Sequence, residues 1–311
     1  MAAVLEMAGL TKRFGDVVAV NDLALSLAPG DCFGFIGPNG AGKTTTMRIL
    51  ATLLEPTRGG AFIDGLDVRK KGKQVRKLVG YMPDFMGVYD DLKVFEYLEF
   101  FAAAFGLERA KRKGIVEGVL ELTDLQSKRA ATVDSLSRGM QQRLQLARVL
   151  IHDPKVLILD EPASGLDPRA RIEIRELLRE LKRMGKTIMI SSHILSELEE
   201  MCDHVGIIEN GHMIFSGTLE EVWQRVGINT KVRVRVAGEM DKAVELLAAL
   251  PQVQDAHQEN DHISVTFQEG QVVDGLIARA LVAGNIDLIE LVREQIKLDQ
   301  AFLQLTKGIV H

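Results

Sequence analysis

Nine residues between positions 37 and 45 have the types and spacing of a phosphate-binding loop. They read Gly37-Pro38-Asn39-Gly40-Ala41-Gly42-Lys43-Thr44-Thr45, with an apolar stretch before them and a stretch of helical composition after them. Glycines let the backbone turn tightly enough for its N–H groups to point at phosphate oxygens, and a helix start adds partial positive charge. In this pattern Lys43 reaches the β- and γ-phosphates, and the Thr44 hydroxyl binds Mg²⁺. A glycine-rich turn that matches by chance is the alternative, and the flanking strand and helix argue against it.

Two adjacent carboxylates follow a second apolar stretch. Val156–Leu159 is expected to form a buried parallel strand, and Asp160 and Glu161 come at its C-terminal end, the edge where open α/β sheets bind ligands. Asp160 suits contact with Mg²⁺, directly or from the second shell, and Glu161 suits a general base that polarises the attacking water. Adjacent residues on a strand point to opposite faces, which would give the carboxylates different roles. Without the phosphate-binding loop, a solvated acidic turn would be an equally good interpretation.

The pattern of apolar residues predicts two domains. Through residue 226, short apolar stretches alternate with longer stretches of helical period, which indicates an α/β core, and a mostly helical block from about 89 to 151 is expected to form a subdomain on it. From 227 to 311 the order strand, helix, strand, strand, helix, strand is typical of a small α+β domain of the ferredoxin-like type, followed by a helix over 298–305. The expected core strands are Val4–Gly9, Ala24–Leu27, Cys32–Ile36, Ala61–Ile63, Leu78–Met82, Val156–Leu159, Thr187–Ser191, Val205–Glu209 and Met213–Ser216.

Composition excludes several classes of protein. With 46% apolar and 26% charged residues the chain is typical of a soluble globular protein. No apolar run approaches the roughly 18–20 residues that span a bilayer, and the N-terminus does not have the pattern of a signal peptide. The formal net charge is −5, and residues 231–307 contain 8 Lys and Arg against 12 Asp and Glu, so nucleic acid is not an expected partner. Cys32 and Cys202 lack metal-ligand spacing and are expected to be buried thiols in a reducing cytosol.

Six motifs in one order resemble the ATP-binding subunits of ABC transporters. Phe14 stands where this family stacks an aromatic ring on the adenine, and the loop at 37–45 follows. Ser164–Asp167 resembles the family's D-loop, and His193 resembles its switch histidine, which contacts the γ-phosphate. The remaining motifs are the carboxylates Asp160 and Glu161 and the segment Leu136-Ser137-Arg138-Gly139-Met140, which is similar to the family signature LSGGQ.

The resemblance implies an ATPase that works as a homodimer with ATP and Mg²⁺. Two copies would face each other head to tail, so Ser137 and Gly139 of one copy would serve the ATP held by the loop of the other. The partner would be a separate integral membrane permease, and the protein would lie at the cytoplasmic face of the cell membrane. The ending Lys297–Leu303 resembles that of ABC-2 exporters, so we expect the ATPase subunit of an exporter.

Three residues, in two motifs, depart from the family pattern. Asp84 stands where the family usually has a glutamine that touches Mg²⁺, and we expect Asp84 to keep this contact as a shorter, charged oxygen ligand. In the signature, Arg138 replaces a glycine and Met140 replaces the glutamine. Arg138 could add a contact to phosphate or lie in solvent, and the sequence does not decide between these. Because Glu161 and His193 are retained, we expect an active site.

The aromatic residues concentrate between 81 and 105, where all three tyrosines lie. Such a segment is either a local core or a partner-binding groove. Family resemblance favours a groove for the permease here, and we expect Phe85, Met86 and Tyr89 to line it. The main alternative function is a soluble ABC ATPase that acts on the ribosome, although such proteins usually carry two cassettes. A DNA-repair ATPase is disfavoured because no long coiled coil follows the phosphate-binding loop, and a module that only binds ATP is disfavoured by Glu161 and His193.

Overall fold

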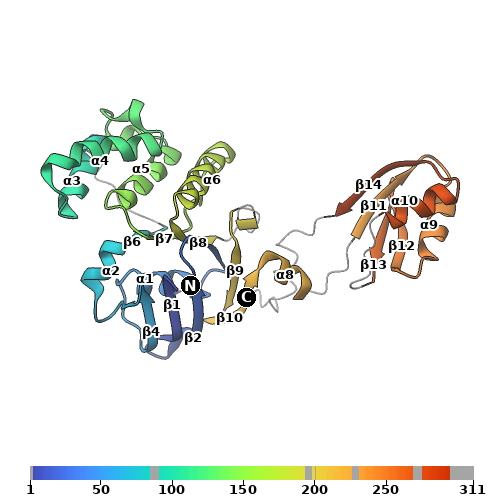
Figure 1. Cartoon of the computed structure of the whole chain (residues 1–311), viewed down its shortest axis with the longest axis horizontal. Coiled ribbons are helices and arrows are strands. Elements are labelled where there is room, and N and C mark those ends of the chain that lie inside the picture. Colours follow the sequence, from blue (N-terminus) through green and yellow to red (C-terminus); the bar gives the residue numbers. More distant parts are fainter. Residues whose placement is uncertain are drawn as a thin grey trace. The chain divides into compact units, whose positions relative to one another are not determined.

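The chain divides into two compact units, Met1–Leu219 and Glu220–His311 (Figure 1). A computed structural model describes residues 3–84, 91–192, 198–199, 201–225, 231–268 and 275–294. The expected domain boundary, after residue 226, lies a few residues beyond this division. Each unit has its own hydrophobic core. Among the described residues, no helix is long and apolar enough to cross a membrane.

The centre of the first unit is a six-stranded sheet with the order β10-β9-β3-β8-β7-β6. Five of the strands are parallel, and only β10 runs antiparallel to its neighbour. β3, β7 and β8 are buried along their whole length, as expected for parallel strands covered on both faces. Because they are parallel, their C-terminal ends lie at one edge of the sheet. The strands are β3 (Cys32–Ile36), β6 (Val79–Met82), β7 (Val156–Asp160), β8 (Thr187–Ser192), β9 (His204–Glu209) and β10 (His212–Thr218).

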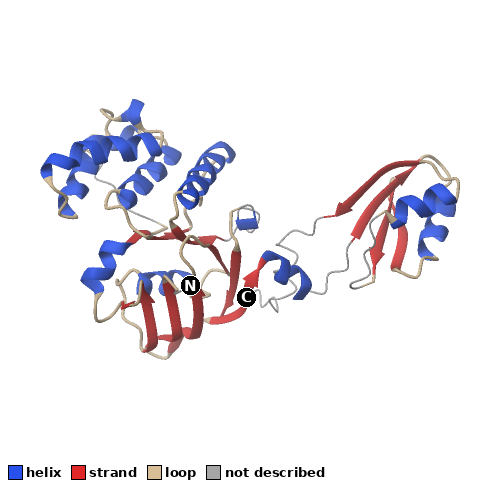
Figure 2. Ribbon diagram, in the orientation of Figure 1, coloured by secondary structure: helices blue, strands red, loops and turns tan. Residues whose placement is uncertain are grey.

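A second, antiparallel sheet with the order β2-β1-β4-β5 completes the core (Figure 2). Its strands are β1 (Leu5–Phe14), β2 (Val17–Leu27), β4 (Arg58–Ile63) and β5 (Leu66–Asp67). Helix α1 (Lys43–Leu50) contacts β2 and β4 of this sheet and β7 of the other, and one hydrophobic core joins them. The nine expected core strands are all confirmed. Most are longer than predicted, and the short β5 was not predicted.

Three helices that contact one another lie in the range expected for the helical subdomain: α3 (Val94–Ala104), α4 (Arg109–Leu122) and α5 (Arg138–Leu150). Two short 3-10 helices, η1 (Gln126–Lys128) and η2 (Val133–Ser135), lie between α4 and α5. The neighbouring α6 (Pro168–Arg183) is capped by Asp167, whose side chain accepts a hydrogen bond from the N–H of Ala170. Two further helices are α2 (Gly72–Leu78), before β6, and α8 (Leu219–Arg225), after β10.

The second unit has the element order predicted for it through its last strand. It contains β11 (Lys231–Val236), α9 (Met240–Ala248), β12 (Val253–Glu259), β13 (His262–Phe267), α10 (Leu276–Ala283) and β14 (Leu288–Glu294). The strands form an antiparallel sheet with the order β12-β13-β11-β14. On β11 the valines are buried while Lys231 and Arg233 are exposed, so one face of this strand packs on the core of the unit and the other faces solvent. The helix expected at 298–305 lies outside the described residues.

Candidate active site

Glycines in the loop between β3 and α1 lie against backbone carbonyl groups. A Cβ on Gly37 would overlap the carbonyl oxygen of Ile208, and a Cβ on Gly42 would overlap that of Ala19. Gly42 also has a φ of 109°, a conformation that favours glycine, and it caps α1 without a side-chain hydrogen bond. The N–H groups of such an uncapped first turn bind anions.

Lys43 is buried inside the loop. Its Nζ donates hydrogen bonds to the carbonyl oxygens of Gly37 at 2.6 Å and Pro38 at 3.2 Å. Burial lowers the pKa of Lys43, while the carboxylates of Glu161 and Asp160 act in the opposite direction. The ammonium group is therefore positioned by the loop before a phosphate arrives, close to both carboxylates.

Asp160 ends β7 as a buried carboxylate. Its Oδ1 accepts a hydrogen bond from Ser191 Oγ at 2.6 Å. Its Oδ2 is buried and has no hydrogen-bond partner among the described residues. A buried carboxylate oxygen without a donor is costly unless a cation or water completes it, so this atom fits a metal ligand.

Glu161 corrects one step of the sequence argument. Alternation along a strand would direct Asp160 and Glu161 to opposite faces, but β7 ends at Asp160 and Glu161 has a φ of 51°. The N–H of Glu161 donates to Ser191 Oγ at 2.9 Å, and its carbonyl accepts from the N–H of Ser164 at 3.0 Å. This turn of positive φ, which is uncommon for glutamate, lets both carboxylates line the same cavity.

One cavity of about 170 Å³ brings three separate segments together. It is lined by residues 38–45 of the loop, by Asp160 and Glu161 at the end of β7, and by Asp84 just after β6. The parallel order of the sheet explains the meeting, because these segments follow strands that end at the same edge. The cavity thus joins a phosphate-binding loop, a positioned cation and three carboxylates.

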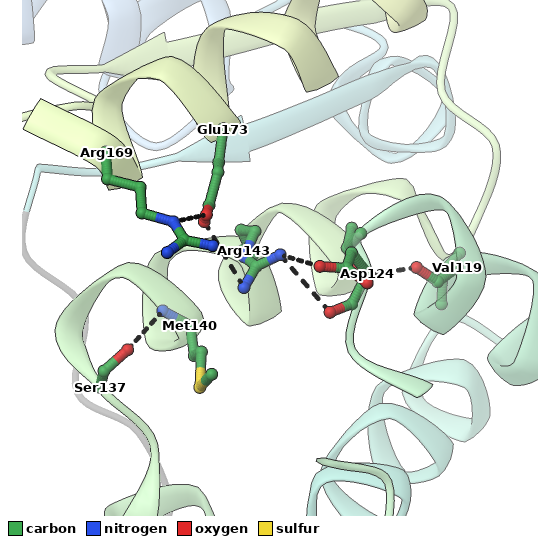
Figure 3. A network of polar contacts seen from close by, with 8 residues as sticks. Val119, Asp124, Ser137, Met140, Arg143, Arg169 and Glu173 are labelled. Carbon is green, nitrogen blue, oxygen red and sulfur yellow. Dashed lines mark hydrogen bonds and ion pairs between the residues drawn. The ribbon is translucent and has the colours of Figure 1, made fainter. Parts of the chain in front are cut away.

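The signature residues line a second cavity of about 640 Å³, shared with the start of α6. Ser137 caps α5, and its side chain accepts a hydrogen bond from the N–H of Met140 at 3.3 Å (Figure 3). A Cβ on Gly139 would lie 2.8 Å from Cβ of Ala170, so this glycine permits close approach of α5 and α6. Ser137 and Gly139 are not among the residues that line the first cavity.

Arg138 lies against the D-loop. Its Nη2 donates to the carbonyl oxygen of Ser164 at 3.4 Å, and its guanidinium group covers Gly165. Arg138 is exposed, which agrees with one of the two placements that the sequence left open, and it also contacts the D-loop.

Phe14 and His193 are the remaining predicted residues. Phe14 ends β1 with 48% of its surface exposed, and the ammonium of Lys12 lies 5.0 Å from its ring centroid. His193 lies outside the described residues, as do Phe85, Met86 and Tyr89 of the expected groove.

Sequence reasoning missed a buried arginine beside the signature. Arg143 forms ion pairs with Asp124 at 2.9 Å and with Glu173 at 3.7 Å, and Glu173 also pairs with Arg169 at 3.1 Å (Figure 3). These contacts join the segment after α4 to α5 and α6. The signal in the sequence was an arginine among the apolar positions expected for this helix. Lys and Arg are almost never fully buried without a charged partner, so such a position predicts an ion pair.

The fold and the first cavity define a nucleoside triphosphatase of the P-loop class. Residues 20–164 match the profile of the ABC transporter family. The Nod factor export ATP-binding protein I of Cupriavidus metallidurans is 43% identical over 222 residues, which are 71% of this chain and 73% of that protein. The protein of the same name from Bradyrhizobium diazoefficiens is 39% identical over 78% of this chain and 79% of its own length.

A solved structure gives the same result. The ATP-binding subunit of an ABC transporter superimposes with a TM-score of 0.66 at 30% identity, covering 72% of this chain and 93% of that one. The chain therefore belongs to the ABC transporter ATP-binding proteins, and it is an ABC transporter ATPase.

Proposed function

We propose that this chain is the ATPase subunit of an ABC exporter and that it powers a separate membrane permease through ATP-driven closure of a homodimer. The observation that carries the proposal is the cavity that joins the phosphate-binding loop to Asp160 and Glu161. Export is supported by relatives at 39–43% identity whose name is Nod factor export ATP-binding protein I.

Mg²⁺ is the metal that this cavity fits. The unpartnered Oδ2 of Asp160 is a hard oxygen ligand, and Thr44 and Asp84 line the same cavity. Asp84, Asp160 and Glu161 line the cavity but do not themselves form a metal-holding group, since the described residues contain no such group of three or more His, Cys, Asp or Glu. The residues present therefore suit Mg²⁺, which usually keeps waters and substrate phosphates among its ligands. The bound ion would neutralise charge on the phosphates.

In this proposal Glu161 polarises the attacking water and Lys43 binds the β- and γ-phosphates. The turn that holds both backbone polar groups of Glu161 supports the first role, because a general base must be held within hydrogen-bond reach of its water. By resemblance to the family, His193 would contact the γ-phosphate.

The homodimer uses the signature cavity. Ser137 and Gly139 at the start of α5 would receive the phosphate end of the ATP bound to the other copy, where a helix N-terminus favours an anion. The half-exposed ring of Phe14 would stack on the adenine. ATP then stabilises the closed dimer only by the amount by which its binding free energy for the closed state exceeds that for the open state.

The permease would hold the chain at the cytoplasmic face of the membrane, and no nucleic acid partner is proposed because the chain is acidic. The nucleotide-binding domain would comprise residues 1–226 and an accessory domain 227–311. For the accessory domain we propose the ferredoxin-like fold, which its element order and antiparallel sheet support.

Substitution Glu161→Gln tests the catalytic assignment. We expect Mg²⁺-dependent phosphate release to fall by about 10²–10⁴-fold, the usual effect of losing a general base, while ATP still binds. Glu108→Gln is the matched control, because Glu108 is an exposed residue at the start of α4 that pairs with Lys111. A Glu161→Gln variant that kept the wild-type rate would refute the assignment.

Purification from gently solubilised native membranes tests the transporter assignment. A polytopic membrane protein in stoichiometric amount is the expected partner. Co-purification with ribosomes instead would contradict the exporter proposal and favour an ABC ATPase that acts on the ribosome.

A further inference from the structure

Helix α5 is attached to the segment that directly follows Glu161. Gln142 is buried, and its Nε2 donates a 2.7 Å hydrogen bond to the carbonyl oxygen of Pro162. Arg138, one turn earlier on the same helix, donates to the carbonyl oxygen of Ser164. Residues four apart lie on one face of a helix, so a single face of α5 holds both carbonyl groups.

The buried hydrogen bond is the stronger of the two. An N–H···O distance of 2.7 Å is at the short end of the normal range, whereas 3.4 Å is long. Arg138 is exposed, but its guanidinium group also covers Gly165, where a Cβ would lie 2.6 Å from Nη1. Gln142 therefore provides most of the attachment, and Arg138 supports it at the surface.

The attachment adds to the contacts that hold the turn at Glu161. Ser191 Oγ accepts from the N–H of Glu161, and the N–H of Ser164 donates to its carbonyl. The next carbonyl along the chain, that of Pro162, is the one held by Gln142. A shift of α5 would therefore be transmitted through one hydrogen bond to the peptide beside Glu161.

We propose that Gln142, supported by Arg138, is a positioning residue for hydrolysis, which couples the signature helix to the geometry of Glu161 in the same chain. The inference rests on the proposed role of Glu161 as the base. Ser137 caps the same helix, so contact of the signature with the ATP of the other copy acts on the helix that holds Pro162. The coupling requires no contact of Gln142 with ATP.

Substitution Gln142→Met removes the donor and keeps the length of the side chain. We expect the kcat of Mg²⁺-dependent ATP hydrolysis to fall about 2- to 30-fold, the range of mutations that change coupling between sites. The KM and the Kd of a fluorescent ATP analogue should stay within about twofold of wild type, since Gln142 lines neither the first cavity nor the signature cavity. Gln141→Met is the matched control, because Gln141 donates to Val133, away from this segment, and its kcat should not change.

The same substitution in the Glu161→Gln background tests whether Gln142 acts through Glu161. If it does, Gln142→Met should lower kcat little further once the base is absent, because the effects of substituting two residues that act as one unit are not additive. Arg138→Met gives a second test at an exposed position, with a smaller fall in kcat, should Gln142→Met lower the Tm below the assay temperature.

The inference is overturned by an unchanged kcat in both variants, by a loss of ATP affinity in place of kcat, or by full additivity with Glu161→Gln. Failure of the proposed function looks different, because Glu161→Gln alone would then hydrolyse ATP at the wild-type rate.

Discussion

Substitution of alanine at three glycines of the phosphate-binding loop distinguishes the effect of backbone strain on stability from that of steric overlap. Gly40 has a φ of 81° and nothing within 4 Å of an added Cβ, so an alanine there meets only strain. Gly37 has no positive φ, but its Cβ would overlap the carbonyl oxygen of Ile208. Gly42 has both a φ of 109° and an overlap with the carbonyl oxygen of Ala19.

The expected losses of unfolding free energy follow from these surroundings. A left-handed conformation costs about 1–2 kcal/mol in a residue with a Cβ, so Gly40→Ala should lose about that amount. Overpacking costs about 1–3 kcal/mol, which is the expectation for Gly37→Ala. Gly42→Ala should lose roughly the sum, about 2–5 kcal/mol, because the strain and the overlap act at one residue. Alanine also restricts the unfolded chain more than glycine does, and this reduces the loss of unfolding free energy by the same amount in all three variants.

Thermal unfolding of the ATP-free protein measures these differences, since 1 kcal/mol changes the Tm by about 2–4 °C in a domain of this size. Gly40→Ala serves as the matched control for strain and Gly37→Ala for overlap. Equal Tm values for Gly40→Ala and Gly42→Ala would show that the contact with Ala19 relaxes without cost and would refute the reasoning.

Three other outcomes follow from the described contacts. Arg143→Met should lower the unfolding free energy by about 1–3 kcal/mol in denaturant titration, because the hydrogen bond of Arg143 to the Asp124 carboxylate and its ion pair with Glu173 are lost. Asp124→Asn, at a side chain 93% exposed, should lose less than about 1 kcal/mol, and the reverse order would contradict the burial argument. Burial lowers the pKa of Lys43, so the folded state releases this proton more readily than the unfolded state. The unfolding free energy should therefore rise as the pH increases from the lowered pKa toward 10.5, and Lys43→Met should reduce that slope in unfolding measured against pH. Cys32 and Cys202 are buried free thiols whose Sγ atoms lie 3.8 Å apart, and their hydrogen bond and burial raise the pKa of Cys202, so a thiol reagent should modify both only in denaturant; rapid reaction of the native protein would count against their burial.

Local sequence determined the strands and the phosphate-binding loop. β3 was predicted at its observed bounds because a short apolar run before a glycine loop has few alternatives. β1 and β2 extend beyond prediction because their far ends form a hairpin with polar and exposed residues around Gly15, where backbone pairing and not side-chain burial decides the structure.

The identity of the chain as an ABC transporter ATPase was also contained in the sequence, since motif types and order carry it. The meeting of Asp84, Asp160 and the loop could be inferred once the sheet was taken as parallel, because the order of the strands sets which segments share an edge. The roles of the individual site residues remain predictions.

Only the tertiary structure decided how the carboxylates, Arg138 and Gln142 are used. Glu161, with its positive φ, donates its N–H to Ser191 of β8, a residue 30 positions away that no local pattern includes. The contacts of Arg138 and Gln142 with the segment after Glu161 join residues 20 or more positions apart, as does the ion pair of Arg143 with Glu173. A polar residue on a helix has the same local signal whether it faces solvent or a buried carbonyl group, and only the packing of α5 against that segment distinguishes the two.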